Sequence, residues 1–311
     1  MSRPLFSIIT LNWNRKEDVL RTLKTITAQT YPKKEILVVD NGSRDGSVAA
    51  IREAFPDVRV LDLGKNLGVA GYNEGMKIVS GEYLMLIDND MELLQNDSLE
   101  SIAAYFDANP KLGAAGMQVR DHTGVALSPN NPKYWEEQGD EARGYPCSTF
   151  DGGGVAIRKS VLDQVGLYLP QFFVYHSEVD LSTRIWDAGY EIRYFPRVAV
   201  WHRESPVSRN PALHTFYATR NYLWYVWIYY PAALAIHESL HFLQRSFLQT
   251  LRARRPIASW AKGVLTAAWR WPRLGVTRKP ARKATIQWMQ QLREKDRQRK
   301  EKAPIGTSAA K

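Results

Sequence analysis

The stretch 83-YLMLIDNDMELL-94 carries the feature on which the fold assignment depends, a run of strand-forming apolar residues that ends in two aspartates. Tyr83 to Ile87 is predicted to be a buried strand. Residues i and i+2 of an extended chain point the same way, so Asp88 and Asp90 would repel each other unless a positive group lay between them. Two interpretations are open: a solvated strand end with an Asx turn around Asn89, or a divalent cation held by hard oxygen ligands.

The segments that precede this strand alternate between strand and helix patterns. The expected strands are 5–11, 35–40 and 58–63, and the expected helices are 16–30, 48–55 and one that follows 66-NLGVAGYNEG-75 and reaches Val79. This alternation with short links predicts an α/β fold with a mostly parallel sheet and helices on both faces. Ligands of such sheets bind beyond the carboxyl ends of the strands, where Asn12, Asp40 and Asp88 lie.

The pattern continues after residue 94 with longer loops. We expect a helix at 99–108, a strand at 114–119, a polar loop at 121–150 that covers a site or is a plain insertion, a strand and a helix from Lys159 after 151-DGGG-154, and a strand pair at 191–202. Ser177 and Asp180 have the spacing of a capping box, which predicts that a helix begins at Ser177. Beyond about residue 210 the sequence becomes an aromatic helix and then a basic tail.

The net charge of +10 is distributed unevenly along the 311 residues. Residues 244–311 hold 18 Lys or Arg and 3 Asp or Glu, a net charge of +15, whereas residues 1–243 hold 24 and 29, a net charge of −5. Tryptophans at positions 260, 269, 271 and 288 lie in the basic segment. Tryptophan among basic residues favours an anionic membrane surface. RNA is the less favoured partner, and a solvated tail is the third interpretation.

Composition excludes several classes of protein. The chain is 44% hydrophobic and 24% charged, which is typical of a globular protein with a large core. Its single cysteine, Cys147, excludes an internal disulfide and is expected to be a buried thiol in a reducing compartment. The N-terminal MSRPLFSIITLNWN lacks the layout of a signal peptide. The longest apolar run, 223-LWYVWIYYPAALAI-236, contains Pro231 and suits a buried or interfacial helix better than a membrane span.

Two groups of residues in the first half could bind a ligand, and both also have a structural interpretation. Asp40 and Asn41 could hydrogen-bond a ligand or could only cap a turn. The glycine-rich segment 66–75 could let backbone N–H groups approach a phosphate, although such loops are common.

The remaining candidates are acidic residues and a histidine. Asp88 and Asp90 form the possible metal pair, and His202 could complete it. Glu178 and Asp180 could supply a general base. They could also simply favour the N-terminus of their helix, where acidic side chains are stabilising.

Taken in order along the chain, the motifs resemble glycosyltransferase family 2, and within it the bacterial rhamnosyltransferase-like branch. The resemblance rests on the strings SIITLNWNRKEDVLRTLKTITAQTYPKKEILVVDNGSRDGS, NLGVAGYNEG, LMLIDNDMEL, GGGVAIRKSVLDQVG, SEVDLSTRIWDAGY and VAVWH. It implies a GT-A fold over residues 1–215, in which a nucleotide-binding sheet merges with an acceptor-binding half. Residues 216–311 would then form an aromatic helical segment and a basic, membrane-associating tail.

The resemblance also implies roles for individual residues. A nucleotide-sugar donor would be bound by Thr10, Asn12, Asp40, Asn41, Asn66, Gly68, Gly71, Asn73, Asp88, Asn89, Gly153 and Gly154. Asp88-Asn89-Asp90 matches the family's Asp-x-Asp motif, which holds Mg²⁺ or Mn²⁺ on the diphosphate, and His202 matches a histidine that often assists. Where the related branch usually reads Glu-Asp-x-Asp, this chain reads 177-SEVD-180. Glu178 is therefore the expected catalytic base, with Asp180 as an accessory or rival.

The implied reaction is an inverting, metal-dependent sugar transfer. An acceptor hydroxyl, deprotonated by Glu178, would attack a UDP- or dTDP-linked sugar, with dTDP-rhamnose as one candidate donor. The acceptor would be a lipid-linked glycan or a cell-surface polysaccharide precursor, and the location cytoplasmic and peripheral, at the inner face of the cell membrane. Because Ser177 replaces the first acid of the motif, a non-catalytic nucleotide-sugar-binding homologue that scaffolds a membrane assembly is the alternative.

Overall fold

The computed structural model describes residues 3–124, 142–203, 210–271, 275 and 277–302. The strands are β1 (Phe6–Asn12), β2 (Lys34–Asp40), β3 (Arg59–Asp62), β4 (Tyr83–Asp88), β5 (Met91–Leu93), β6 (Leu112–Arg120), β7 (Tyr145–Pro146), β8 (Gly154–Arg158) and β9 (Glu191–His202). The helices are α1 (Lys16–Thr27), α2 (Ser47–Ala54), α3 (Ala70–Ile78), α4 (Ser98–Ala108), α5 (Lys159–Val165), α6 (Ser177–Asp187), α7 (Pro211–Tyr229), α8 (Ala232–Arg252), α9 (Ile257–Arg270) and α10 (Lys283–Lys302), with a 3-10 turn at Pro170–Phe172. Parts of the expected loop at 121–150 and of the basic tail lie outside the described residues.

The strands form one mixed sheet with the order β3-β2-β1-β4-β8-β6-β9-β5, and β7 pairs with β9. The first four strands are parallel, as expected. β8 is antiparallel to both β4 and β6, while β6 runs parallel to β9. Because β2 and β4 lie on opposite sides of β1, the chain reverses its direction of travel across the sheet there. Asn12 is level with Asp40, and Leu11 with Asp88, so three strand ends meet at this switch point.

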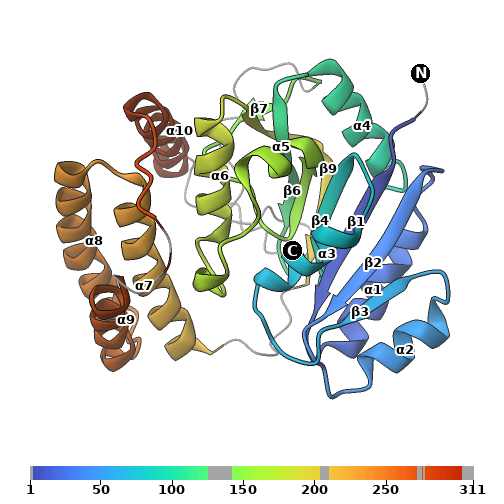
Figure 1. The fold of residues 1–311 in the computed structure, drawn as a ribbon, viewed down its shortest axis with the longest axis horizontal. Coiled ribbons are helices and arrows are strands. Elements are labelled where there is room, and N and C mark those ends of the chain that lie inside the picture. The colour runs from blue at the N-terminus through green and yellow to red at the C-terminus, as the bar shows by residue number, and fades with distance from the viewer. Residues whose placement is uncertain (1–2, 125–141, 204–209, 272–274, 276, 303–311) are drawn as a thin grey trace.

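Helices cover both faces of the sheet, which confirms the expected layers. Side chains of α1, α2 and α4 pack in one core, and those of α3, α5 and α6 pack in the other. Figure 1 shows the sheet seen between these helices, with the remaining helices gathered to one side. Cys147 is buried as expected, and this burial raises the pKa of its thiol to about 12.

The expected strands and helices between residues 5 and 120 all occur, with ends that differ by at most three residues. The expected strand pair at 191–202 is wrong, since β9 is one strand whose pairing with β6 shifts between Phe195 and Ala199. In the sequence, Pro196 predicts a break between two strands, because proline has no backbone N–H to donate to a neighbouring strand. The bulge accommodates it without ending the strand. The patterns also do not indicate the short strands β5 and β7.

The C-terminal helices form a third core centred on α7. Residues Leu223 to Tyr230 are largely buried there, together with Ala235 of α8, Ala267 of α9 and Ile286 of α10. The aromatic segment therefore packs on protein. α10 then returns to the sheet unit, where Trp288 lies edge-on to Trp186 of α6 at a centroid distance of 6.0 Å. Among the described helices, none is both long enough and apolar enough to cross a membrane.

Candidate active site at the sheet edge

Asn12 lies at the centre of a buried network at the carboxyl ends of the strands. Its Nδ2 donates to Asp40 Oδ2 at 2.8 Å, and its Oδ1 accepts from Asn89 Nδ2 at 2.8 Å. The backbone N–H of Ser43 donates to Asp40 Oδ1 at 2.6 Å, which fixes the turn after β2. Asn12 and Asp40 are fully buried, as is Thr10 two residues earlier in β1. The network therefore holds the ends of β1, β2 and β4 in fixed register with one another.

The glycine-rich segment packs against the turn after β2. Asn41 Nδ2 donates to the carbonyl oxygen of Gly68 at 3.1 Å, and Asn66 Oδ1 accepts from the Gly68 N–H at 2.8 Å. Gly68 has a φ of +60°, and a Cβ there would lie 2.1 Å from the carbonyl oxygen of Phe173. A Cβ on Gly71 would lie 2.7 Å from Asn41 Oδ1. The glycines thus allow the close approach of three chain segments.

Asn73 takes a structural part in this arrangement. Its Nδ2 donates to the carbonyl oxygen of Tyr168 at 2.8 Å, and its Oδ1 accepts from the Tyr168 N–H at 3.1 Å. Both ends of the amide are therefore engaged by one backbone residue. Asn73 ties α3 to the segment that follows α5.

Asp88 and Asp90 flank the turn between β4 and β5 and have different partners. Asp88 Oδ1 lies 3.0 Å from the hydroxyl of Tyr72. Asp90 Oδ2 accepts from Arg15 Nη1 at 2.5 Å, and its Oδ1 lies 3.5 Å from His202 Nε2. The structure therefore brings His202, at the end of β9, to the aspartate pair from more than 100 residues away in the chain.

The electrostatic states of the two aspartates differ. Burial, together with the negative charges of Asp90 and Asp151, raises the pKa of Asp88 to about 6. Burial acts on Asp90 in the same direction, but the hydrogen bond with His202 and the charge of Arg15 hold its pKa at about 2. Burial would lower the pKa of His202, yet its contact with Asp90 raises it. Within the pair, protein cations thus already offset the charge of Asp90, whereas they do not offset that of Asp88 to the same extent.

The loop 151-DGGG-154 lies against both Asp88 and a second acidic residue, Glu178. An added Cβ on Gly153 would lie 2.5 Å from Asp88 Oδ2, and one on Gly152 would lie 2.5 Å from Glu178 Oε1. Asp88 and Glu178 therefore both lie against adjacent peptide units of one loop. Gly154 begins β8 next to β4, opposite Ile87, so the sheet fixes the position of this loop. Burial, then the charges of Asp151 and Asp88, raise the pKa of Glu178 to about 7.

Asp180 has a different environment from Glu178. It is fully buried, and its Oδ1 accepts from the hydroxyl of Tyr229 and its Oδ2 from Arg184 Nη2, each at 2.5 Å. Burial raises the pKa of Asp180. With both oxygens engaged, this carboxylate joins α6 to α7.

The helix α6 begins at Ser177 as expected, but the capping box is wrong. Ser177 Oγ forms no hydrogen bond with the described residues, and Asp180 turns to Arg184 and Tyr229 instead. The residue before the helix, His176, has a φ of 66°. Helix α6 therefore begins without a side-chain cap, directly after a residue in the left-handed conformation.

That segment, residues 172–176, is strained and is held from α7. Phe173, Tyr175 and His176 all have φ values of 62° to 66°, a region that non-glycine residues rarely adopt. Asn221 Nδ2 lies 2.6–2.9 Å from the carbonyl oxygens of Phe172, Val174 and Tyr175. Neighbouring Arg220 donates to the carbonyl oxygen of Phe172 at 3.2 Å. The orientation of Glu178 thus depends on a helix that the sequence motifs do not include.

The donor set at the sheet edge can be tested against a divalent cation. Within the described ranges, no group of three or more His, Cys, Asp or Glu side chains is arranged to hold an ion by itself. Mg²⁺ is commonly bound by one or two carboxylates together with substrate phosphates. Asp88 and Asp90 supply such a pair, and the repulsion that adds to burial in raising the pKa of Asp88 is one that a cation would relieve. These residues fit a metal that binds jointly with a diphosphate.

The match to a family model decides the classification of the chain. Residues 7–166, which include the strand ends, the glycine-rich segment and Asp88 to Asp90, match the model of glycosyl transferase family 2. The chain belongs to glycosyl transferase family 2. The resemblance expected from the motifs is thereby confirmed.

Two curated relatives of this family 2 chain illustrate the range of its similarity. A poly-beta-1,6-N-acetyl-D-glucosamine synthase from Staphylococcus epidermidis is 29% identical over 198 residues, which are 61% of this chain and 47% of that relative. The chain thus spans about half the length of this relative. An N-acetylglucosaminyl-diphospho-decaprenol L-rhamnosyltransferase from Mycobacterium tuberculosis is 26% identical over 246 residues, 67% of this chain and 79% of that relative. A rhamnosyltransferase is therefore among the relatives, as the motifs predict.

A solved structure confirms the fold of the family 2 chain. The mannosyltransferase of Pyrobaculum calidifontis, in complex with GDP-Man and Mn²⁺, has a TM-score of 0.59 at 18% identity and covers 97% of this chain and 87% of its own. At this identity the likeness shows the fold alone, which is the expected GT-A fold.

Several residues at the site have no counterpart among the sequence predictions. Arg15, Tyr72, Asp151, Gly152 and Asn221 all touch or position the acidic groups. Asp151 and Gly152 stand directly beside Gly153 in the quoted loop, so a closer examination of that loop could have found them. Tyr72 lies within the glycine-rich segment 66–75, although nothing in that segment indicates its contact with Asp88, whereas Arg15 and Asn221 are brought to the acidic groups by the tertiary structure.

Proposed function

We propose that this protein transfers a sugar from a nucleotide-diphospho-sugar to a hydroxyl group of a lipid-linked glycan or polysaccharide precursor, with inversion at the anomeric carbon. The observation that carries the proposal is the convergence of Asp88 and Glu178 on the backbone of Gly152 and Gly153. One carboxylate lies at the end of β4 and the other in the first turn of α6, which would be the nucleotide side and the acceptor side of the reaction. A transferase needs the groups that bind the donor and the group that activates the acceptor to lie close together around the reacting atoms.

The donor side of the proposal uses the strand ends. Asp40, held by Asn12, would present its carboxylate to the nucleobase of the donor. The backbone of the glycine-rich segment would face the ribose and diphosphate. The remaining proposed donor contacts are Thr10, Asn41, Asn66, Gly68, Gly71, Asn89, Gly153 and Gly154. Asn73 is the weakest of the proposed contacts, because its amide is engaged by Tyr168.

Asp88 and Asp90, with His202 beside them, would hold Mg²⁺ or Mn²⁺. The bound cation would offset the charge that develops on the leaving nucleoside diphosphate. Burial acts to raise the pKa of Asp90, but its contacts with His202 and Arg15 hold that pKa at about 2, so the Asp90 carboxylate would be ionised when a cation binds.

Glu178 is the proposed general base, and Asp180 is the positioning residue. A base works best when its pKa lies near the operating pH, and burial raises the pKa of Glu178 to about 7. Glu178 would take the proton of the acceptor hydroxyl as that oxygen bonds to the anomeric carbon and the bond from this carbon to the diphosphate oxygen breaks. The displacement is a single step, so it inverts the configuration and needs no covalent nucleophile.

The relatives suggest which donors to test first. One is named as an L-rhamnosyltransferase acting on an N-acetylglucosaminyl-diphospho-decaprenol, and another as an N-acetylglucosamine polymer synthase. We therefore propose dTDP-rhamnose and UDP-N-acetylglucosamine as leading donor candidates, followed by UDP-glucose and UDP-galactose. A lipid-linked acceptor would place the protein at the inner face of the cell membrane.

The experiment is donor hydrolysis in the absence of acceptor, measured as release of UDP or dTDP from each of the four donors with and without Mn²⁺. We expect Mn²⁺-dependent release from one donor, and its loss in Asp90→Ala. If no donor is cleaved and Mn²⁺-dependent nucleotide binding is also absent, the proposal is wrong. Binding without cleavage, even with candidate lipid-linked acceptors added, would favour the non-catalytic binding homologue instead.

A further inference from the structure

Helix α9 packs two small residues, Gly263 and Ala267, on the protein and leaves the large side chains of Leu265 and Trp269 exposed. A Cβ on Gly263 would lie 2.9 Å from the carbonyl oxygen of Phe216, so this residue packs directly on α7. Ala267, one turn later, is buried, and its carbonyl oxygen accepts from Trp224 Nε1 at 3.1 Å. Successive residues of a helix are separated by about 100°, so Leu265 and Trp269 lie on the side opposite this seam.

The outward face of α9 is apolar from end to end. Ile257, Leu265 and Trp269 are 46%, 70% and 69% exposed. The residues that lie between them on this face are alanines, at positions 258, 261 and 268. An amphipathic surface helix normally has the reverse arrangement, with its polar side toward water. The outward face of α9 is therefore an apolar strip that is largely exposed in the described structure.

Basic side chains border the outward face of α9. Lys262 lies beside Leu265, with its Nζ 5.7 Å from the ring centre of Phe216, and Arg270 ends the helix. These residues and Trp269 surround an open hollow of about 810 Å³ between α7 and α9. Helix α9 contains no Asp or Glu, so the charges beside this face are basic. A partner that is apolar inside and anionic at its surface would complement it.

We propose that the outward face of α9, defined by Ile257, Leu265 and Trp269 and bordered by Lys262 and Arg270, docks on a bilayer that contains anionic phospholipids. Leucine and tryptophan side chains enter the boundary between head groups and acyl chains, and lysine and arginine pair with the phosphates. The 810 Å³ hollow gives room for a head group at this border.

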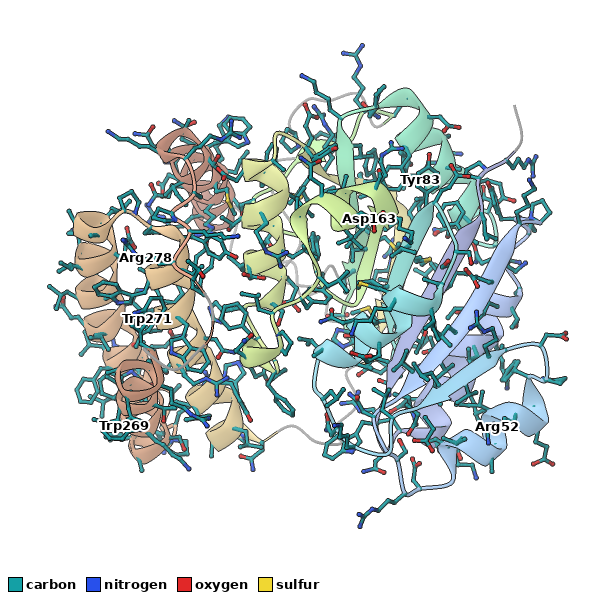
Figure 2. All side chains as sticks on the ribbon, in the orientation of Figure 1. Arg52, Tyr83, Asp163, Trp269, Trp271 and Arg278 are labelled. Carbon is teal, nitrogen blue, oxygen red and sulfur yellow. The ribbon has the colours of Figure 1, made fainter. Side chains whose placement is uncertain are left out.

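The docking face lies at the far end of the molecule from the nucleotide-side helices. Figure 2 shows Trp269 on α9 at the opposite end of the longest axis from Arg52 of α2. On α7, Phe216 lines the hollow, and the next residue, Tyr217, stacks on Phe173 in the segment before Glu178. A lipid surface on α9 would therefore lie next to the acceptor side of the site. This relation to a lipid-linked acceptor rests on the proposed function, whereas the docking itself does not.

The test is flotation of the full chain with vesicles of phosphatidylcholine mixed with phosphatidylglycerol, compared with vesicles of phosphatidylcholine alone. We expect binding to the mixed vesicles, weaker binding to the neutral ones, and a loss of roughly tenfold or more in Leu265→Glu/Trp269→Glu. Ile78→Glu is the matched control, since Ile78 is a 42% exposed apolar residue on α3 outside this face. The control should bind like the wild type.

Three results would overturn the proposal. The double variant could bind vesicles as well as the wild type, or the wild type could ignore vesicles and be retained on RNA through these residues. Light scattering could also show a dimer that the double variant dissociates, which would assign the face to a second copy of the chain. Donor hydrolysis is measured on the same samples without vesicles. Vesicle binding without hydrolysis would contradict the proposed function alone, and hydrolysis without vesicle binding would contradict the docking alone.

Discussion

The two sides of the site are held in place by different kinds of contact. On the donor side, Asn12, Asp40 and Asn89 bond one another at the ends of adjacent strands, so the sheet itself positions them. On the acceptor side, Glu178 follows a strained segment that Asn221 holds from α7. The sheet thus positions the proposed donor-binding residues through its own strand ends, whereas the position of Glu178, the proposed base, depends on contacts with the later helix α7.

The glycine loop is where the two sides meet, and its substitution gives the largest expected effects. Gly153→Ala would place a Cβ 2.5 Å from Asp88 Oδ2, and Gly152→Ala would place one 2.5 Å from Glu178 Oε1. Displacements near 1 Å at reacting groups cost about 10²-fold. We expect a loss of that order in kcat/KM for both variants, through Mn²⁺-dependent donor binding in the first and through kcat in the second. Steady-state kinetics of donor hydrolysis and calorimetric titration with nucleotide measure the two terms.

Gly116→Ala is the matched control for the loop variants. Its Cβ would meet Phe150 Cβ at 3.5 Å, an ordinary contact, inside the same sheet. Equal effects of Gly152→Ala and Gly153→Ala on donor binding would mean that the loop does not separate the two sides.

Asn221→Ala tests the acceptor side. The substitution removes the donor to three backbone carbonyls and frees the strained segment before α6. We expect kcat to fall by roughly tenfold to a hundredfold while the donor Kd stays within a factor of about two. Asn109→Ala controls for loss of an amide contact, because among the described contacts the Asn109 side chain bonds only to Tyr105 of α4, the helix that Asn109 follows. Weaker donor binding with an unchanged kcat would contradict the division between the two sides.

Asn12→Ala tests the donor side and should have a smaller effect of the opposite kind. It leaves Asp40 and Asn89 without their shared partner. Loss of a buried amide in such a network costs about 1–3 kcal/mol, part of which we expect to appear as a roughly tenfold weaker donor affinity. kcat at saturating donor should change little, and stopped-flow or steady-state measurement at several donor concentrations separates the two. A fall in kcat without a change in donor affinity would assign Asn12 to the chemical step.

The pH dependence of stability isolates Glu178 and should give the smallest effect. Its pKa is raised to about 7 by burial, whereas in the unfolded chain a glutamate titrates near 4.3. Between these values the folded state holds the proton more tightly, so stability falls as the pH rises through this window. We expect Glu178→Gln to melt a few degrees above the wild type at about pH 8 and close to it at about pH 5. A Tm difference that is the same at both pH values would show that folding does not raise the pKa of Glu178.

Much of the donor side could be predicted from the sequence, because its residues end apolar runs that mark strands. Asn12, Asp40 and Asp88 were placed together by the rule that parallel strands share their carboxyl edge. His202 was a possible third metal ligand by residue type, and the resemblance matched it to an assisting histidine, but nothing in VAVWH itself indicates that β9 ends beside β5.

The acceptor side could be predicted only in part. Ser177 to Asp180 suggested a capping box, but the φ of His176 and the pairing of Asp180 with Tyr229 depend on packing between distant segments. Asn221 lies in an aromatic segment whose composition indicates burial. That composition does not indicate which backbone carbonyls the Asn221 side chain would bond. The apolar outward face of α9 could not be predicted from composition either. The sequence shows the small and large residues of this helix but not which side of it packs on α7.

The central claim is that Glu178 acts in the chemical step and not in donor binding. The most direct measurement is single-turnover cleavage of donor already bound with Mn²⁺, compared between the wild type and Glu178→Gln at matched nucleotide affinity. We expect the rate to be lower by about 10²–10⁴ in the variant, with donor binding unchanged. A variant that cleaves bound donor within a few-fold of the wild-type rate would contradict the account and remove Glu178 from the mechanism.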